Sequence, residues 1–232
     1  MKEWRGFIQA DCMDVLPEIP DNYFQLAIVD PPYGGVTAGG YMKNRMPSGP
    51  DSKSKGLAQQ WNDYDLSLWD QDRPGPDYFR ELFRVSENCI IWGGNYFTDC
   101  LPPSQCWVAW DKDKPPGVGY ADIELAYTSF NRAAKIFRYR WNGMLQGDGK
   151  EHETKIHPTQ KPVRLYTWLL ANFAEPGDVI LDTHVGSASS LIACEQLGFE
   201  YFGTEIMGGY YEEAKKRLDD FNAQLRMDWR LP

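Results

Sequence analysis

Residues 24–33 read Phe24-Gln25-Leu26-Ala27-Ile28-Val29-Asp30-Pro31-Pro32-Tyr33, an apolar run followed by a short polar and proline-containing segment. Its first six residues form a short, largely apolar run, which is typical of a buried strand in a parallel sheet. Two adjacent prolines cannot continue a strand, because neither has an N–H to donate. The segment from Asp30 to Tyr33 is therefore predicted to lie at the carboxyl end of a strand. In open α/β sheets, ligands bind at that end.

The same tetrapeptide carries groups suited to binding a planar amine. Asp30 supplies a carboxylate, the prolines leave rigid carbonyls facing outward, and Tyr33 supplies an aromatic ring. Two acceptors can take the two N–H bonds of the amine, and the phenol ring can stack on the ring that bears it. The segment is thus a candidate site for an aromatic amine.

A second strand, turn and helix pattern occurs at residues 181–188, Leu-Asp-Thr-His-Val-Gly-Ser-Ala. Small residues before a helix N-terminus allow the close backbone approach that nucleotide-like cofactors need. A further predicted strand ends at Glu205, 23 residues after Asp182. This spacing is close to the ~20 residues at which an acidic side chain meets ribose hydroxyls in dinucleotide folds. A pyrophosphate would be repelled by Asp182, whereas S-adenosylmethionine, with an ammonium, a ribose and no phosphate, suits both acids.

Length and composition bound the protein class. At 232 residues, the chain is long enough for one α/β domain with a full core. A net charge of −9 argues against a protein that binds nucleic acid over its whole surface. An apolar content of 42% with 14% aromatic residues indicates a folded globule.

The cysteines and the N-terminus indicate a reducing compartment. The five cysteines form no C-x-x-C pair and are odd in number, so the sequence favours neither a zinc site nor a disulfide framework. The start of the chain has no apolar segment of signal-peptide length, and no run approaches the 18 apolar residues of a membrane span. We therefore expect a cytoplasmic protein with no membrane partner and no metal.

The pattern along the chain alternates between strands and helices. It predicts strands at 6–10, 24–29, 89–92, 106–110, 123–130, 179–181 and 201–203, and helices at 14–18, 76–87, 162–173, 187–197 and 210–225. No internal repeat or linker occurs. We therefore expect a single domain over residues 1–232, with inserted target-contacting segments at about 34–60 and 131–155.

The order of three motifs along the chain is informative about the protein family. Asp30-Pro31-Pro32-Tyr33 comes first, then His157-Pro158-Thr159-Gln160-Lys161-Pro162, then Asp182-x-x-x-Gly186-Ser187. In this permuted order the chain resembles the β-class amino-methyltransferases of DNA, which modify adenine N6 or cytosine N4, and the resemblance covers nearly its whole length. It implies a Rossmann-like, doubly wound methyltransferase fold with a mixed, mostly parallel, seven-stranded sheet. It also implies S-adenosyl-L-methionine as cofactor and double-stranded DNA as partner.

The resemblance implies two sets of site residues. The catalytic set is Asp30, Pro31, Pro32 and Tyr33. The cofactor-binding set is Asp11, Cys12, Thr159, Lys161, Asp182, Gly186, Ser187, Ala188, Glu205 and Ile206.

Within the cofactor set, each end of the cofactor has its expected residues. Asp11 would lie at the adenine end, Lys161 at the methionine end, Glu205 on the ribose and Ile206 against the adenine face. The family turn usually reads Asp-Pro-Phe-x-Gly-Ser-Gly, and this chain departs from it at Thr183, His184 and Ala188. We interpret His184 as a residue of the turn rather than a base. Residues 92–97 are as consistent with core packing as with the target pocket.

Two basic islands interrupt the acidic chain and are candidate DNA contacts, because an enzyme on DNA needs a local positive face. Residues 34–60 carry a net charge of +3 and residues 131–140 carry +4. The candidate DNA-binding residues are Lys43, Arg45, Lys53, Lys55, Arg132, Lys135, Arg138 and Arg140. The first island lies in a long, glycine-rich segment without periodicity, which predicts a functional loop.

The motifs together predict methyl transfer to the exocyclic amine of a flipped-out DNA base, as in restriction–modification systems. We favour adenine N6 over cytosine N4, because cytosine-directed members of the family more often carry Ser where this chain has Asp30. Methylation of RNA or of a protein amide, and an inactive nucleic-acid-binding relative, stay open as alternatives. The recognition sequence and the oligomeric state, monomer or homodimer, are not specified by the sequence.

Overall fold

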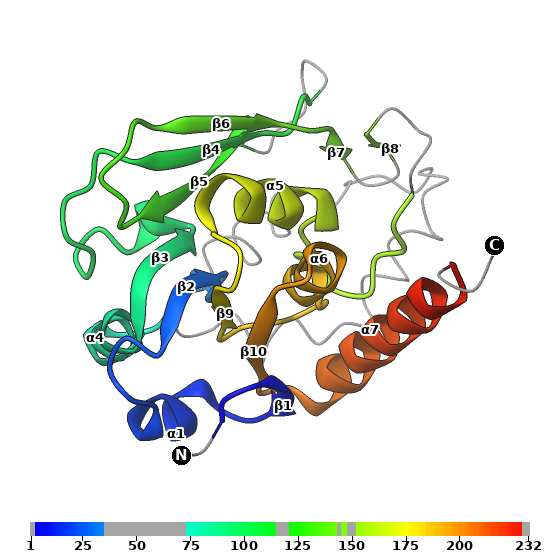
Figure 1. Ribbon diagram of the computed structural model, residues 1–232. Helices are drawn as coiled ribbons and strands as arrows, with labels where there is room; N and C mark the ends of the chain where they lie inside the picture. The colour runs from blue at the N-terminus through cyan, green and yellow to red at the C-terminus, as the bar shows by residue number, and fades with distance from the viewer. Residues whose placement is uncertain (1–2, 35–72, 115–120, 143–144, 148–151, 229–232) are drawn as a thin grey trace, which may run out of the picture.

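The computed structural model describes residues 3–34, 73–114, 121–142, 145–147 and 152–228 (Figure 1). From residue 35 on, the predicted target-contacting segment 34–60 lies outside these ranges. Its candidate DNA contacts Lys43, Arg45, Lys53 and Lys55 therefore lie outside the described residues. In the described part of the chain, no helix combines the length and the apolar character needed to cross a bilayer.

A twisted eight-stranded sheet forms the centre of the molecule, in the order β1-β10-β9-β2-β3-β5-β4-β6. Its strands are β1 (Gly6–Gln9), β2 (Phe24–Val29), β3 (Ser86–Trp92), β4 (Trp107–Asp111), β5 (Ile123–Thr128), β6 (Lys135–Arg138), β9 (Val179–Asp182) and β10 (Glu200–Glu205). Only β5 runs antiparallel to its neighbours; the other pairs are parallel. A separate two-stranded ladder joins β7 (Trp141–Asn142) and β8 (Leu145–Gln146).

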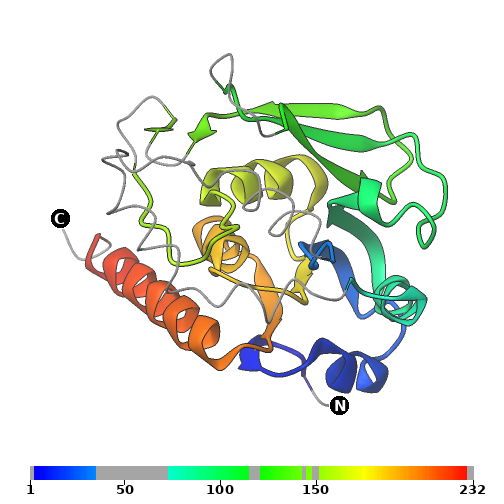
Figure 2. The same cartoon turned by 180° about the vertical axis from the view of Figure 1, so that it is seen from behind.

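Helices cover both faces of the sheet, so the described part of the chain has three layers. The helices are α1 (Cys12–Val15), α4 (Pro76–Val85), α5 (Val163–Phe173), α6 (Ser189–Leu197) and α7 (Gly208–Asp228), with 3₁₀ turns η1 (Leu16–Glu18) and η2 (Gly94–Tyr96). Figures 1 and 2 show α5 and α6 inside the curve of the sheet and α1 and α4 outside it. Helix α7 packs against α6, β1 and β10.

The strand β2 shows why this sequence forms a central strand. Phe24, Ala27 and Val29 pack into the cluster under α1 and α4, whereas Leu26 and Ile28 pack into the cluster under α5 and α6. All five side chains are at most 1% exposed. Burying each of the larger ones stabilises the fold by roughly 1.5–3 kcal/mol. A strand buried on both faces fixes the position of the residues that follow it.

The predicted strands and helices are all present, with bounds that shift by a few residues, and the β7–β8 ladder was not predicted. Three further differences change the expected architecture. The sheet has an eighth strand, because the short segment Lys135–Arg138 pairs with β4. The helix predicted over 76–87 ends at Val85, and β3 begins at once with Ser86. Pro162 is the N-cap of α5 in an extended conformation rather than its first helical residue.

The topology brings the candidate residues to one edge of the sheet. Asp30, Gly93 and Lys112 directly follow β2, β3 and β4, and Asp11 comes two residues after the end of β1. Asp182 and Glu205 are the last residues of β9 and β10. Because β5 runs in the opposite direction, Glu124 near its start lies at the same edge. Asp11, Asp182 and Glu205 lie on the β1-β10-β9 side of the sheet, and Asp30, after β2, lies at its centre. Strands β3, β5, β4 and β6 form the other side.

Candidate active site

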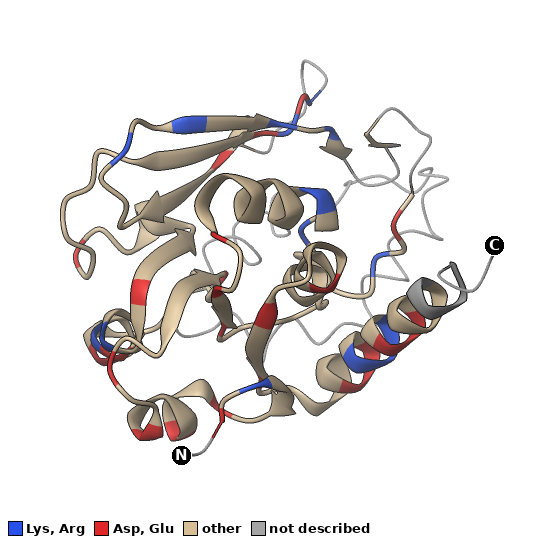
Figure 3. Ribbon diagram, viewed as in Figure 1, with Lys and Arg blue, Asp and Glu red and all other residues tan. Residues whose placement is uncertain are grey.

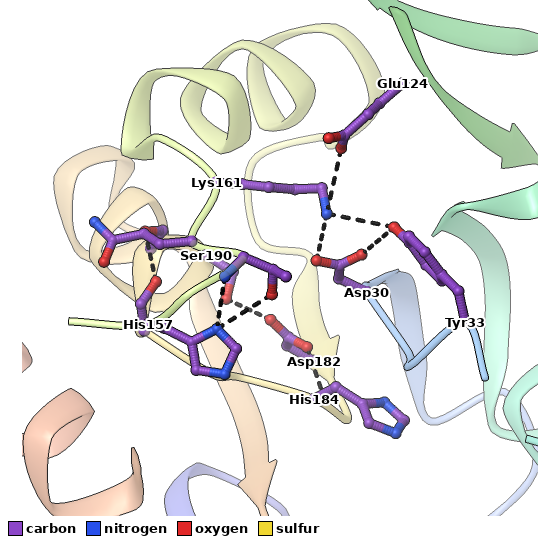
Figure 4. A network of polar contacts seen from close by, with 12 residues as sticks. Asp30, Tyr33, Glu124, His157, Lys161, Asp182, His184 and Ser190 are labelled. Atoms are coloured by element: carbon purple, nitrogen blue, oxygen red, sulfur yellow. Dashed lines mark hydrogen bonds and ion pairs between the residues drawn. The ribbon is translucent and has the colours of Figure 1, made fainter. Parts of the chain in front are cut away.

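Asp30 is held by two neighbours directly beyond β2. Its Oδ1 accepts a hydrogen bond of 2.6 Å from the hydroxyl of Tyr33, and its Oδ2 accepts one from the ammonium of Lys161 (Figure 4). The Lys161 Nζ also lies 3.5 Å from the Tyr33 hydroxyl oxygen. A carboxylate can accept about four hydrogen bonds. Asp30 therefore keeps acceptor capacity for a ligand in this arrangement.

Lys161 is a buried cation between two carboxylates. It is 5% exposed and lies between Asp30 and Glu124, whose Oε2 is 3.6 Å from the Lys161 Nζ (Figure 4). Burial opposes its charged form, but the charges of Asp30 and Glu124 outweigh burial and raise the pKa of Lys161. The sequence predicted that Lys161 meets the methionine end of the cofactor, whereas the structure places its ammonium on the carboxylate of Asp30.

The ring of Tyr33 is fixed by the turn that follows β3. Tyr96 stacks on it with ring centroids 5.0 Å apart, and Phe97 meets it edge-on at 6.0 Å. Gly93 has a φ of +66°, and a Cβ at this position would fall 2.2 Å from Tyr33 Cε1. Only glycine allows this approach without moving the ring. Burial and the charge of Asp30 raise the pKa of Tyr33, which keeps its hydroxyl protonated as a donor.

Asp182 anchors the small-residue turn after β9. Its carboxylate accepts hydrogen bonds from the Ser190 hydroxyl and, at 3.0 Å, from the backbone N–H of His184. The side chain is 2% exposed. Burial raises its pKa to about 7, despite these two bonds, which act in the opposite direction. This acid therefore holds the turn in place from within.

Thr183 and His184, two of the residues that differ from the usual family turn, form a small polar network with Tyr78. The Thr183 hydroxyl lies 2.7 Å from the Tyr78 hydroxyl and 2.9 Å from His184 Nδ1. Tyr78 also meets the His184 ring edge-on at 5.4 Å. Burial lowers the pKa of His184 to about 4, so its ring is neutral at pH 7. These contacts agree with the prediction that His184 is a residue of the turn.

The rest of the turn is shaped by two left-handed residues. Gly186 has a φ of +56°, and Ala188, the N-cap of α6, has a φ of +61°. For a residue with a Cβ, this conformation costs roughly 1–2 kcal/mol. Ala188 stands where the family usually has glycine, and it is fully buried. The smallest side chain with a Cβ is thus accommodated in the backbone shape that glycine normally provides.

Glu205 closes the turn from the end of β10. Its Oε2 accepts the N–H of Gly186 and its Oε1 accepts the N–H of Met207, each at 2.9 Å. Burial raises its pKa, and the backbone hydrogen bonds act against that rise. The next residue, Ile206, is 56% exposed despite its apolar side chain. A half-exposed isoleucine beside an acid at a strand end leaves an apolar surface for a flat ring.

Asp11, which is predicted to meet the adenine end of the cofactor, and Cys12 follow β1, the strand that pairs with β10. Asp11 is the N-cap of α1, where its Oδ1 accepts the N–H of Met13 at 2.9 Å. Ala10, just before it, donates its N–H to the carbonyl of Glu205 at 3.1 Å. Cys12 is buried, and burial together with Asp11 raises its pKa to about 12. Its thiol therefore stays protonated at neutral pH.

The segment before α5 is fastened to the turn. His157 meets Tyr210 at 4.3 Å between ring centroids, and Thr159 lies beside its Nδ1, with its hydroxyl at 3.2 Å. A Cβ on Gly186 would reach His157 at 3.9 Å, so this ring lies over the turn. Thr159, predicted as a cofactor residue, is exposed at the rim. Its neighbour Lys161 points away from the turn toward Asp30 (Figure 4).

A second fastening comes from α7. Arg217 donates to the carbonyl of Ser187 at 2.6 Å and to Glu153 Oε2 at 2.7 Å. Glu153 Oε1 in turn accepts the N–H of Val163, the first residue of α5. Arg217 and Glu153 thus join the start of α5 to the turn. No motif pointed to this pair, because its members are 64 residues apart in the sequence.

The basic island at residues 131–140 is partly neutralised. Figure 3 shows basic positions along β6 and acidic positions on the adjacent strands. Arg138 pairs with Asp111 at 3.4 Å and Arg140 pairs with Asp113, both from the neighbouring β4 and the turn after it. Lys135 opens β6, and Arg132 lies over the Phe130 ring at 4.9 Å. The charge that DNA would meet here is smaller than the sequence count of +4 implies.

Comparisons with known proteins agree with this arrangement. A family model described as DNA methylase matches residues 102–216. The type II methyltransferase M2.MboI of Moraxella bovis is 24% identical over 255 residues, which cover 96% of this chain and 90% of that protein. These matches extend across the segments that carry Lys161, Asp182 and Glu205.

Solved structures show the same fold. The crystal structure of the M1.HpyAVI–SAM complex aligns with a TM-score of 0.52 at 18% identity, covering 91% of this chain and 98% of that one. The PvuII DNA methyltransferase, described as cytosine-N4-specific, aligns with a TM-score of 0.58 at 10% identity, covering 97% and 93%. The predicted doubly wound methyltransferase fold is confirmed, with eight sheet strands in place of seven.

Proposed function

This chain belongs to the DNA methylase family that modifies the N6 or N4 amines of bases, and from that premise we propose that it methylates adenine N6 in double-stranded DNA. The observation that supports this proposal best is the position of Asp30. It lies at the centre of the carboxyl edge, between the acids of the cofactor side and the strands of the other side. Tyr33 and Lys161 orient its carboxylate there.

The family uses S-adenosyl-L-methionine, and the donor set of this chain fits it. Residues 181–188 contain no Lys or Arg that would favour a phosphate. Glu205 faces the turn with acceptor capacity left for ribose hydroxyls, because a carboxylate can accept about four hydrogen bonds and the backbone N–H groups of Gly186, Met207 and Ile206 do not use all of them. Ile206 offers an exposed apolar face for the adenine. When bound, the cofactor supplies an electrophilic methyl group on a positively charged sulfur.

Asp30 and the carbonyl of Pro31 have the task of making the target amine nucleophilic. The lone pair of an aromatic amine is delocalised into its ring, so the nitrogen attacks poorly. Two acceptors that take its two N–H bonds favour a pyramidal nitrogen with a localised lone pair. A carboxylate is the stronger of the two acceptors, because hydrogen bonds to a charged group are roughly twice as strong as neutral ones. Correct positioning of the amine supplies much of the remaining acceleration.

Tyr33 and the strands beyond it would receive the base. An amine inside a duplex is out of reach, so the base has to be flipped out of the stack. Tyr96 already covers part of the Tyr33 ring, which limits where a base can stack. Arg132 and Lys135, with the described part of residues 131–155, are the basic groups we propose to meet the DNA backbone. Phosphate contacts of this kind position the duplex without reading its sequence.

Substrate class is the first property to test. Purified protein with S-adenosylmethionine labelled with tritium in the methyl group should transfer the label to double-stranded DNA, and not to RNA or protein offered in parallel. Label on RNA or on a protein amide would replace the proposed substrate with one of these. Absence of label on all three, with cofactor bound, would indicate an inactive nucleic-acid-binding relative.

A further inference from the structure

Four charged side chains form a row that leads from the surface to Asp30. Lys112, after β4, bonds to Glu124 on β5; Glu124 faces Lys161, and Lys161 bonds to Asp30. Figure 4 shows Lys161 between the two carboxylates, which come from opposite sides of it. The catalytic motif and the Lys161 segment were visible in the sequence, whereas Glu124 lies in an ordinary strand. The row is thus created by the fold.

Glu124 and Lys161, the two inner groups of the row, favour each other's charged form. Burial disfavours the ionised form of Glu124, but the charges of Lys161 and Lys112 outweigh burial and lower its pKa. The pKa of Lys161 is raised for the corresponding reason, with Asp30 and Glu124 as its partners. Lys161 also lies 5.5 Å from the centre of the Trp92 ring, which can stabilise a cation without neutralising it.

The charges around Lys161 decide how well Asp30 can act on an amine. If Lys161 paired with Asp30 alone, the two charges would cancel beside the target nitrogen. With Glu124 at 3.6 Å, the Lys161 ammonium is shared by two carboxylates, so it neutralises Asp30 only in part. Lys112 pairs with the outer side of Glu124, farther from Asp30, and brings the whole row to zero net charge. A fixed negative charge stabilises positive charge that develops nearby in a transition state.

We propose that Glu124 is a positioning residue of the methyl-transfer site, which draws on the charge of Lys161 so that Asp30 keeps its negative charge for the target amine. This inference rests on the proposed function. In the reaction, the amine nitrogen forms its new bond to the methyl carbon as the carbon–sulfur bond breaks and that electron pair stays on sulfur. The nitrogen then carries a positive charge until it gives a proton to the Asp30 carboxylate, from which the proton passes to solvent.

The position of Glu124 fits this role better than a purely structural one. Glu124 forms an ion pair with Lys161 from β5, which belongs to the side of the sheet beyond Asp30. Its side chain is 29% exposed, so the fold does not need it to fill the core. Lys112 holds it from the outer side, which fixes the carboxylate in reach of Lys161.

The first test is the rate of a single turnover on DNA. Glu124→Gln keeps the shape and an acceptor oxygen but removes the charge, and it should lower the methyl-transfer rate roughly tenfold to a hundredfold, with little change in KM for DNA. Glu124→Asp keeps the charge and should recover most of the rate. The matched control is Glu200→Gln, at the opposite edge of the sheet, where Glu200 pairs with Arg5 and is 66% exposed.

The second test needs no methyl transfer. Sinefungin carries a charged amine where the methyl sulfonium of the cofactor stands, whereas S-adenosylhomocysteine carries a neutral sulfur. The ratio of their dissociation constants, measured by calorimetry, reports the negative charge at the transfer position. Glu124→Gln should reduce the preference for sinefungin by roughly threefold to tenfold, since one charge of the site is lost at close range. Glu124→Asp and Glu200→Gln should leave the ratio near the wild-type value.

The outcomes separate this inference from the proposed function. A wild-type rate and an unchanged sinefungin ratio in Glu124→Gln would overturn the inference while leaving DNA methylation standing. Equal losses in Glu124→Gln and Glu124→Asp, accompanied by a lower Tm, would also overturn it in favour of a structural role. If the wild-type chain methylates no DNA and the ratio still falls in Glu124→Gln, the proposed function fails but the charge role of Glu124 holds.

Discussion

Replacing Asp30 with alanine should lower methyl transfer to DNA by a factor on the order of 10³ or more, with cofactor affinity nearly unchanged. Asp30 lies at the centre of the carboxyl edge, and its loss removes the group that we propose activates the amine. It also leaves the buried ammonium of Lys161 with Glu124 as its remaining carboxylate partner in the described structure. Single-turnover assays on DNA and calorimetry with S-adenosylmethionine measure the two quantities separately.

The folding of this variant has its own control. An unpaired buried charge is destabilising, so Asp30→Asn, which keeps an acceptor for Lys161, should be made beside Asp30→Ala. Asp219→Ala, on the surface of α7 where Asp219 is 68% exposed, removes an acid far from the site and should behave as wild type. Near-normal turnover in a folded Asp30→Ala or Asp30→Asn enzyme would rule out the mechanism.

Replacing Glu205 with alanine should weaken cofactor binding roughly tenfold to a hundredfold, because charged hydrogen bonds of this kind contribute about 1.5–3 kcal/mol. The structure adds a second reason for the loss. Glu205 also holds the N–H groups of Gly186 and Met207, so the turn itself loses an anchor. Calorimetry with S-adenosylmethionine measures the dissociation constant directly.

The two reasons can be distinguished with a second variant. Glu205→Gln keeps an acceptor for one backbone N–H but loses the charge toward the ribose, so it should fall between wild type and Glu205→Ala. Thermal unfolding without cofactor reports the loss of the turn anchor alone. A dissociation constant unchanged in both variants would place the ribose elsewhere.

The fold could be predicted from the sequence because its strands are buried on both faces. The run from Phe24 to Val29 is apolar along its length, and the prolines that follow mark its end to the residue. Strand β6 was missed, since Lys135–Arg138 is short and carries a charge at each end. Its place in the sheet depends on pairing with β4, which a local pattern does not reveal.

The candidate site was predictable where a motif is local. The tetrapeptide at Asp30 and the turn from Asp182 to Gly186 lie where they were expected, at strand ends on one edge. Contacts between distant segments were not predictable. Lys161 meets Asp30 across 131 residues of sequence, and Glu124 meets Lys161 only because β5 reverses direction.

The charge count of the second basic island was misleading for the same reason. Arg138 and Arg140 have no acid within residues 131–140, but Asp111 and Asp113 reach them from the neighbouring strand and its turn. A sequence window adds up only the charges of residues that are adjacent in the chain. In a sheet, a neighbouring strand from elsewhere in the chain lies about 4.7–4.9 Å away, so its charges also count. Net charge on a surface is therefore a property of the fold.

The identity of the methylated base is the decisive measurement for the proposed function. Double-stranded DNA treated with the protein and S-adenosylmethionine should be digested to nucleosides and separated by mass spectrometry, with Asp30→Ala protein as the control. The proposal predicts N6-methyldeoxyadenosine as the product, and none with the control. N4-methyldeoxycytidine as the sole product would contradict the adenine assignment, and DNA without any methylated base would contradict the proposed function itself.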